Sequence, residues 1–185
     1  ISLRSFNGWS FGPLDLSTYN IPGVGIQFSY SSNVSLSGIN ASGSGKTGYG
    51  IFLYEVQNAT ISNNIVHNKD NGVRVVGLTS SNNIISSNDL SGNNQGVFIG
   101  GADKVGDGNT ISNNNLSNSS AMGITASGEV TILTNDYTDS NSGVSLKYLD
   151  GYTFGPMDFS SYNIKYNVLA IHNSNNVTVT GVNAS

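Results

Sequence analysis

The sequence predicts an all-β fold, a single-stranded parallel β-helix in which the chain winds through about 7–8 coils of 20–27 residues. Three observations predict this fold. A block of 42 residues occurs twice, short β-branched segments follow glycines at intervals of about one coil, and asparagine recurs at one position in successive coils. Such repetition is typical of an array in which each unit packs on its neighbours.

The duplicated block comprises residues 1–42 and 144–185, which align without a gap at an offset of 143 positions. The two copies share 18 identities in 42 positions, and their most distinctive segment, Ser10–Ile21, returns as Thr153–Ile164. A repeat longer than three-quarters of the chain leaves no place for an independent domain boundary. We therefore expect residues 1–185 to form one continuous β-helix segment of a 143-residue tandem repeat, with six coils in each repeat.

Short strand-like segments predict the individual coils. Each of six such segments begins with a glycine: Gly25, Gly50, Gly72, Gly96, Gly123 and Gly143. Alternation within a segment puts Ile26 and Phe28 on one face and Gln27 on the other, so each strand is expected to have one buried face. A second β-branched segment follows each of the first five, and no 3.6-residue periodicity predicts a helix longer than one turn.

Asparagine follows the central apolar residue of the second segment by three positions in four successive coils. The four asparagines are Asn64, Asn88, Asn114 and Asn135, which follow Ile61, Ile85, Ile111 and Ile132. Asparagine tolerates left-handed turns, and stacked amides can form hydrogen bonds along a column. We predict an asparagine ladder beside a buried isoleucine column. The alternative is a set of solvated turn asparagines in an Asn-rich chain.

Segments 57–66 (QNATISNNIV) and 108–116 (GNTISNNNL) resemble the repeats of the NosD-like, pectate-lyase-like superfamily of right-handed parallel β-helices. The resemblance covers residues 23–143 and 166–185 and is greatest to the tandem-repeat surface proteins of archaea and bacteria. It implies a right-handed solenoid. Because members include polysaccharide lyases and hydrolases, tailspike-like proteins and a periplasmic copper-associated protein, the resemblance defines the fold more narrowly than the function.

Composition excludes some classes of partner. Charged residues make up 10% of the chain, while asparagine, serine and glycine contribute 79 of its 185 residues. A hydrophobic fraction of 37% in regular clusters can still bury a core, so we expect a folded chain. A net charge of −4 without a basic stripe argues against nucleic acid. No apolar run reaches the roughly 20 residues that a membrane-spanning helix needs.

Few residues are arranged for catalysis. Asp136 and Asp139 could pair across a turn as acid and base, but solvated turn residues are the favoured interpretation. His67 and His172 are 105 positions apart, which gives a shared metal site little support. The sequence GSGKT at 43–47 lacks the first glycine of a phosphate-binding loop and precedes a strand. We therefore expect neither enzymatic activity nor a cofactor.

One weak metal candidate exists in the longest gap between strand segments. Asp103, Asp107 and Asn109 could offer oxygen ligands to Ca²⁺, which prefers carboxylates and carbonyls. Their number is low for a calcium site, and the spacing is not that of an EF-hand. An ordinary turn is therefore the favoured interpretation.

Aromatic residues concentrate in the duplicated block. Four of them are candidate sugar-stacking residues: Trp9, Phe11, Tyr152 and Phe154. Exposed rings beside polar groups can stack on sugars, whereas large aromatics in general are mostly buried. Core packing in an irregular coil is the favoured interpretation, and a sugar-binding surface is the alternative.

Seven Asn-x-Ser/Thr sequons are candidate glycosylation sites: Asn33, Asn40, Asn58, Asn115, Asn118, Asn176 and Asn183. Composition alone accounts for about six of them, so their number does not establish glycosylation. Two sequons recur in both copies of the duplicated block.

Together these features favour a structural repeat segment of a large extracellular protein at the cell surface, either S-layer-like or filament-forming. Its expected partners are neighbouring repeats or subunits stacked head to tail, with glycans as a further partner. The alternative function is a carbohydrate-binding or polysaccharide-degrading β-helix.

Overall fold

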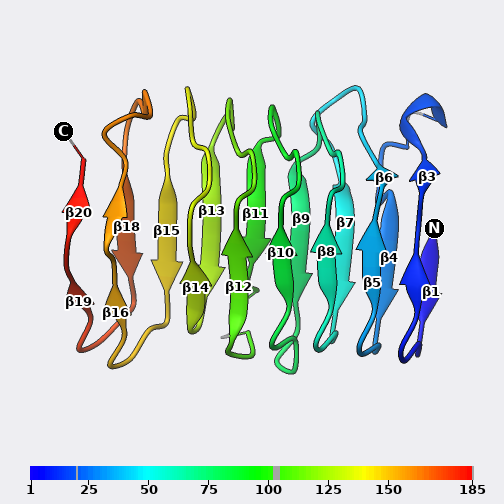
Figure 1. Ribbon diagram of the computed structural model, residues 1–185, viewed down its shortest axis with the longest axis horizontal. Coiled ribbons are helices and arrows are strands. Elements are labelled where there is room, and N and C mark those ends of the chain that lie inside the picture. The colour runs from blue at the N-terminus through cyan, green and yellow to red at the C-terminus, as the bar shows by residue number, and fades with distance from the viewer. Residues whose placement is uncertain (20, 102–104, 185) are drawn as a thin grey trace.

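Parallel pairing of short strands defines the whole computed structural model, which describes residues 1–19, 21–101 and 105–184. The strands stand side by side along the long axis of the molecule, with the two termini at opposite ends (Figure 1). This is the right-handed parallel β-helix that the sequence predicted. The described residues contain one helical turn, η1 (Ser17–Tyr19), and no helix long and apolar enough to cross a lipid bilayer.

The largest sheet, here called the long sheet, has one strand from each coil. Its strands are β1 (Ser2–Arg4), β4 (Ile26–Ser29), β7 (Tyr49–Tyr54), β9 (Asn71–Val76), β11 (Gln95–Ile99), β13 (Met122–Ser127), β15 (Val144–Lys147) and β18 (Leu169–His172). The register joins Leu3 to its duplicate Leu146 in six steps, through Phe28, Leu53, Val75, Ile99 and Ala126. Six coils therefore separate equivalent residues of the two copies.

A second sheet, here called the short sheet, closes another side of the coil. It contains β2 (Ser10–Phe11), β5 (Ser35–Ser37), β8 (Thr60–Ser62), β10 (Ile84–Ser86), β12 (Asn109–Ser112) and β14 (Val130–Ile132), and the pair β16 (Thr153–Phe154) and β19 (Thr178–Val179) follows it. Ile61, Ile85, Ile111 and Ile132 pair in register here, and none is more than 9% exposed. The predicted isoleucines thus stack in one column of the core.

The third side of the coil has short pairs joined by single bridges. The pairs are β3 (Leu14–Asp15) with β6 (Ile39–Asn40), and β17 (Met157–Asp158) with β20 (Val182–Asn183). Between them, single bridges run from Asn40 through Ile65, Asp89 and Asn115 to Asp136. We call this column of backbone pairing the third side.

The recurrent glycines lie where neighbouring coils are closest. A Cβ atom on Gly50 would stand 2.1 Å from Cγ1 of Val66 and 2.8 Å from the carbonyl oxygen of Gly72. A Cβ on Gly96 would stand 2.6 Å from Cδ2 of Leu116. Because these distances are far below van der Waals contact, glycine is required for steric reasons at the start of the long-sheet segments of Gly50 and Gly96.

Candidate functional site

Four buried amides form a hydrogen-bonded column between the short sheet and the third side. Asn64 Nδ2 donates to Asn88 Oδ1 at 2.9 Å, Asn88 Nδ2 to Asn114 Oδ1 at 2.9 Å, and Asn114 Nδ2 to Asn135 Oδ1 at 3.0 Å. The same oxygens accept the backbone N–H of the preceding asparagine, and none of the four side chains is more than 3% exposed. These asparagines are buried and paired, not solvated.

A second pair of stacked amides was missed by the sequence analysis. Asn83 Nδ2 donates to Asn109 Oδ1 at 3.0 Å and to the Val56 carbonyl at 2.9 Å, and both side chains are buried. The signal was present in the sequence, because Asn83 and Asn109 each stand two residues before the isoleucine of their coil. A search confined to asparagines that follow the isoleucine could not find it.

The residues of the calcium candidate do not form a metal site. Asp103 lies outside the described residues. Asn109 points into the core, where its Oδ1 accepts from Asn83, and Asp107 Oδ1 accepts the Glu129 N–H at 3.0 Å. Within the part of the chain that the structure describes, no three His, Asp or Glu side chains are clustered so that they could hold a metal ion.

The acidic and histidine candidates are separated as well. Asp136 Oδ1 accepts the Thr138 N–H at 2.9 Å, whereas Asp139 Oδ1 accepts Asn163 Nδ2 at 2.9 Å, so the two carboxylates serve different turns. His67 Nε2 lies 3.0 Å from Asp89 Oδ2, and His172 lies in β18 of the long sheet. Burial raises the pKa of Asp89, but hydrogen bonds from Ser91 and His67 outweigh it and hold that pKa below its ordinary value.

The GSGKT segment forms a turn that precedes β7. Beneath it lies Lys69, which is 1% exposed and whose Nζ donates to the Ile21 carbonyl. A Cβ on Gly43 would stand 2.9 Å from Cε of Lys69, so the glycine makes room for this side chain. Burial lowers the pKa of Lys69. The turn therefore covers a buried lysine bound to backbone carbonyls, which is not the chemistry of a phosphate-binding loop.

Two of the sequons coincide with a turn that aspartate can also form, and a third pairs with such an aspartate. On the third side, Asn115 Oδ1 accepts the N–H of Ser117 just as Asp89 and Asp136 accept from residues two positions on. Asn40 makes the same turn, and Asn183 pairs with Asp158. Five sequon asparagines are exposed, namely Asn33, Asn58, Asn118, Asn176 and Asn183, while Asn40 and Asn115 are half-buried. Their glycosylation stays a prediction.

The four candidate sugar-stacking residues do not form one surface. Trp9 is 59% exposed at one end of the solenoid, whereas Phe154 is 3% exposed and belongs to the core. Phe11 is half-buried against Phe28, with ring centroids 6.3 Å apart. Tyr152 is half-buried, and its hydroxyl donates to the Val130 carbonyl.

Rings do gather on the outer face of the long sheet, which the sequence analysis did not single out. Arg74 holds its guanidinium carbon 4.7 Å from the Tyr49 ring centre and 4.3 Å from that of Phe98. Its Nη1 also donates to Asn71 Oδ1 at 3.0 Å. Such cation–π contacts fix the guanidinium against the sheet. We call Tyr49, Phe52, Arg74 and Phe98 the ring row.

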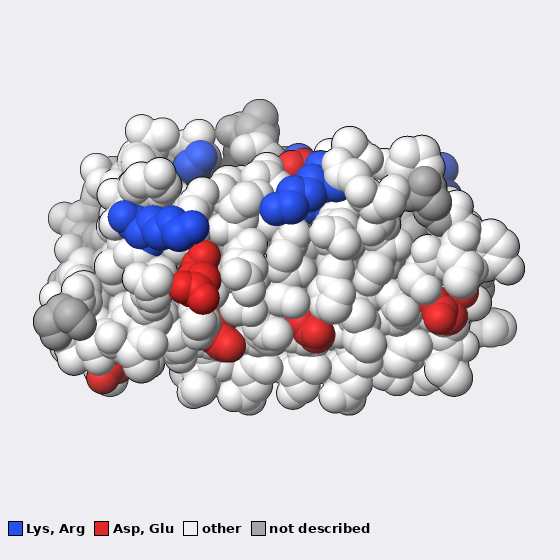
Figure 2. Space-filling model, turned by 90° about the horizontal axis from the view of Figure 1, so that it is seen from above, with Lys and Arg blue, Asp and Glu red and all other residues white. Residues whose placement is uncertain are grey.

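A similar contact lies on the same sheet nearer the N-terminus. The Arg4 guanidinium carbon stands 4.6 Å from the Tyr30 ring centre, and Tyr30 packs edge to face on Tyr54 at 5.2 Å. Both arginines of the chain and Lys147 thus lie on long-sheet strands, whereas Asp15, Asp89, Asp136 and Asp158 lie on the third side. Figure 2 shows basic side chains toward one long edge of the molecule and most acidic ones toward the other.

These features define a parallel β-helix protein with internal amide ladders and an aromatic, basic outer sheet. The family model described as "Periplasmic copper-binding protein (NosD)" matches residues 14–183. The chain therefore belongs to the NosD family. Comparison with curated proteins found no match.

Among solved structures, the chain is similar to a crystal structure of a mutant of the periplasmic alginate epimerase AlgG. The TM-score is 0.48 at 15% sequence identity, over 84% of this chain and 47% of that protein. This chain thus spans about half the length of the epimerase, and the likeness concerns the fold alone. The expectation that this chain is not an enzyme is corrected by this comparison, because AlgG is an epimerase. The likeness itself assigns no activity to this chain.

The copper named in the family description does not fit the residues of this chain. Copper prefers histidine, methionine and cysteine ligands, and the chain has two histidines, two methionines and no cysteine. His67 is paired with Asp89 near the third side, whereas His172 lies in the long sheet five coils further on. Met122 and Met157 lie in β13 and β17. These four side chains are therefore too dispersed along the solenoid to bind one copper ion together.

Proposed function

We propose that this chain is a repeat segment of an elongated NosD-family solenoid located at the cell surface, in an S-layer-like or filament-forming protein. The NosD family is described as periplasmic, which supports export of this chain from the cytoplasm. The observation that carries the proposal is the register that joins the two copies of the duplicated block, because six coils stack without a break between Leu3 and Leu146.

In the second copy, the preceding coil covers the block. Tyr137, which is 1% exposed, packs its ring against Phe159 at 5.4 Å and against Tyr162 at 5.6 Å. The block therefore packs tightly on a regular coil, as a continuous array requires.

The apolar residues of the covered coil are buried as well. Leu149 and Phe154 are 2% and 3% exposed. Burial of apolar surface stabilises by about 25 cal/mol per Å², so this junction holds the block on the regular coils.

Electron microscopy of the native material tests this proposal. Six coils at about 4.8 Å each give an axial rise of about 29 Å per 143-residue repeat. We expect elongated particles at the cell surface in which strands cross the long axis at the 4.8 Å spacing. Compact particles of uniform globular shape, or native material confined to the periplasm, would contradict the proposal.

The ring row supports a second candidate function, carbohydrate binding on the long sheet. Phe52, Arg74 and Phe98 follow one another in register on successive strands, which makes a row of flat groups along the coil axis. Flat rings and a guanidinium are suited to stacking on sugar faces. Loss of retention on a glycan column in a Phe98→Ala variant, with retention kept in a Trp9→Ala variant, would support binding at this row. Equal retention of both variants would exclude it.

A further inference from the structure

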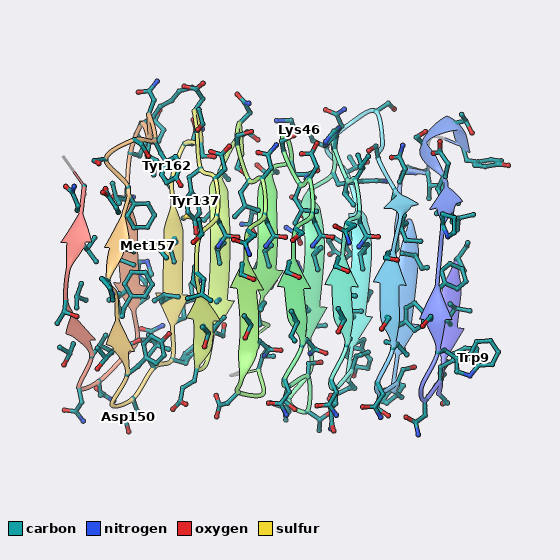
Figure 3. All side chains as sticks on the ribbon, viewed as in Figure 1. Trp9, Lys46, Tyr137, Asp150, Met157 and Tyr162 are labelled. Carbon is teal, nitrogen blue, oxygen red and sulfur yellow. The ribbon has the colours of Figure 1, made fainter. Side chains whose placement is uncertain are left out.

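A cavity of about 390 Å³ lies at the junction of the regular coils with the second copy of the duplicated block. Residues 132–135 and Tyr137 form one wall, and Pro156, Met157, Asp158, Ser161 and Tyr162 form the other. Figure 3 shows Tyr137, Met157 and Tyr162 grouped near the C-terminal end of the solenoid. The volume is within the range of small-molecule sites, at its lower end.

The cavity arises because the amide ladder stops here. Asn135 is the last asparagine of the column, and the next coil has Met157 at the ladder position, whose side chain cannot continue it. Aromatic packing replaces the ladder, because Tyr137 packs on Phe159 and Tyr162. A regular coil junction would not leave this space.

The charge at the cavity is negative. Asp158 is exposed at its rim, and hydrogen bonds from the Ser160 hydroxyl and N–H hold the pKa of its carboxyl below the ordinary value. Burial, and then the charges of Asp136 and Asp158, raise the pKa of Tyr162, so both carboxylates act on that ring. No lysine or arginine is among the described residues that line the cavity.

We propose that this cavity binds an organic ammonium group, such as a trimethylammonium or alkylammonium ion. The Tyr162 ring and the Met157 thioether supply a polarizable surface for the methyl groups, and Asp158 supplies the opposite charge. An anion would be repelled by the carboxylates, and a neutral solute would gain only the apolar contact. The site depends on residues 132–162 alone and not on the tandem array, so its failure would leave the proposed function standing.

Choline and its uncharged carbon isostere test the proposal on the 185-residue chain. We expect saturation transfer from protein to the choline methyl protons and shifts of tyrosine ring resonances, with the isostere bound at least about fivefold more weakly. Equal affinity for both solutes, or no transfer to choline, would overturn the proposal.

The duplicated block offers a matched control for the charge. Asp158→Asn should weaken choline binding about fivefold, because it removes the carboxylate and keeps the turn, which asparagine forms at position 40. Asp15→Asn makes the same change in the first copy, where no preceding coil closes a cavity, and should leave binding unchanged. An unaffected Asp158→Asn variant, or an equal loss in Asp15→Asn, would place binding elsewhere.

The ring is tested in the same way. Tyr162→Leu should weaken choline binding several-fold, and Tyr19→Leu should not, because Tyr19 is its duplicate without the facing wall. Circular dichroism of both variants checks that the β-helix is retained. Unchanged choline binding in a folded Tyr162→Leu variant would overturn the assignment.

Discussion

The regular coils (residues 49–143) and the duplicated block fill the same interior by different means. In the regular coils, buried asparagines bind backbone groups of the neighbouring coil, as Asn88 Nδ2 does with the Ile61 carbonyl at 2.9 Å. In the block, Leu14 and Met157 stand at the ladder position, and rings such as Phe154 and Phe159 fill the interior. Amide ladders require one fixed spacing, whereas ring packing tolerates an irregular coil and leaves space at its junctions.

The largest effect is expected for ring truncation in the covered copy of the block. Phe154→Ala removes a fully buried ring and should lower the free energy of unfolding by about 3–4 kcal/mol. Phe11→Ala, the same change in the half-buried copy, should cost roughly half as much. Urea unfolding measures both. Equal losses would show that the preceding coil adds nothing to the packing of the block.

A smaller loss is expected when the ladder is broken. Asn88→Leu removes the acceptor of the Asn64 N–H, one of the two acceptors of Asn64 Nδ2 and the amide donor to the Ile61 carbonyl, and should cost about 2–3 kcal/mol. The neighbouring change Ser87→Ala removes no ladder bond and should cost less than about 1 kcal/mol. Thermal unfolding compares the two variants. Equal shifts in their midpoints would reject a stabilising role for the ladder.

The smallest effect concerns the glycines. Gly50→Ala forces Cβ against Val66 and the Gly72 carbonyl, and overpacking of this kind costs about 1–3 kcal/mol. Gly23→Ala, in the block, places Cβ in open space and should change stability by less than about 0.5 kcal/mol. Denaturant midpoints distinguish them. If Gly50→Ala left the stability unchanged, the neighbouring coils would be able to move apart at this corner.

The fold could be predicted from the sequence because every coil repeats the same constraints. Gly50 and Gly72 mark the closest approach of coils, and Ile61 and Ile85 mark the core, so spacing alone predicts stacking. The outer faces carry no such repetition. The alternation of apolar and polar residues predicts that Arg74 is solvent-exposed. Its contacts with Tyr49 and Phe98 depend on the register of three strands.

The cavity could not be predicted for a related reason. It requires the end of the ladder at Asn135 and Met157 of the next coil to lie beside each other. Sequence separation between its walls is about one coil, but neither wall has a motif of its own. The expectation that the chain has no enzymatic activity was wrong because it rested on the number of acidic residues in the sequence. That number says little about the activity of a protein with a β-helix fold.

Coil length varies mainly at one corner of the regular coils. The ladder asparagine always follows the isoleucine of its coil by three residues. The next glycine follows the ladder asparagine by eight residues at Asn64–Gly72, Asn88–Gly96 and Asn135–Gly143, and by nine residues at Asn114–Gly123. From the glycine to the isoleucine of the short sheet, however, the distance ranges from nine residues at 123–132 to fifteen at 96–111. Residues can therefore be inserted or deleted in the loop between the long and short sheets without disturbing the ladder. This corner of the coil is where the sequence and length of the solenoid can change most freely.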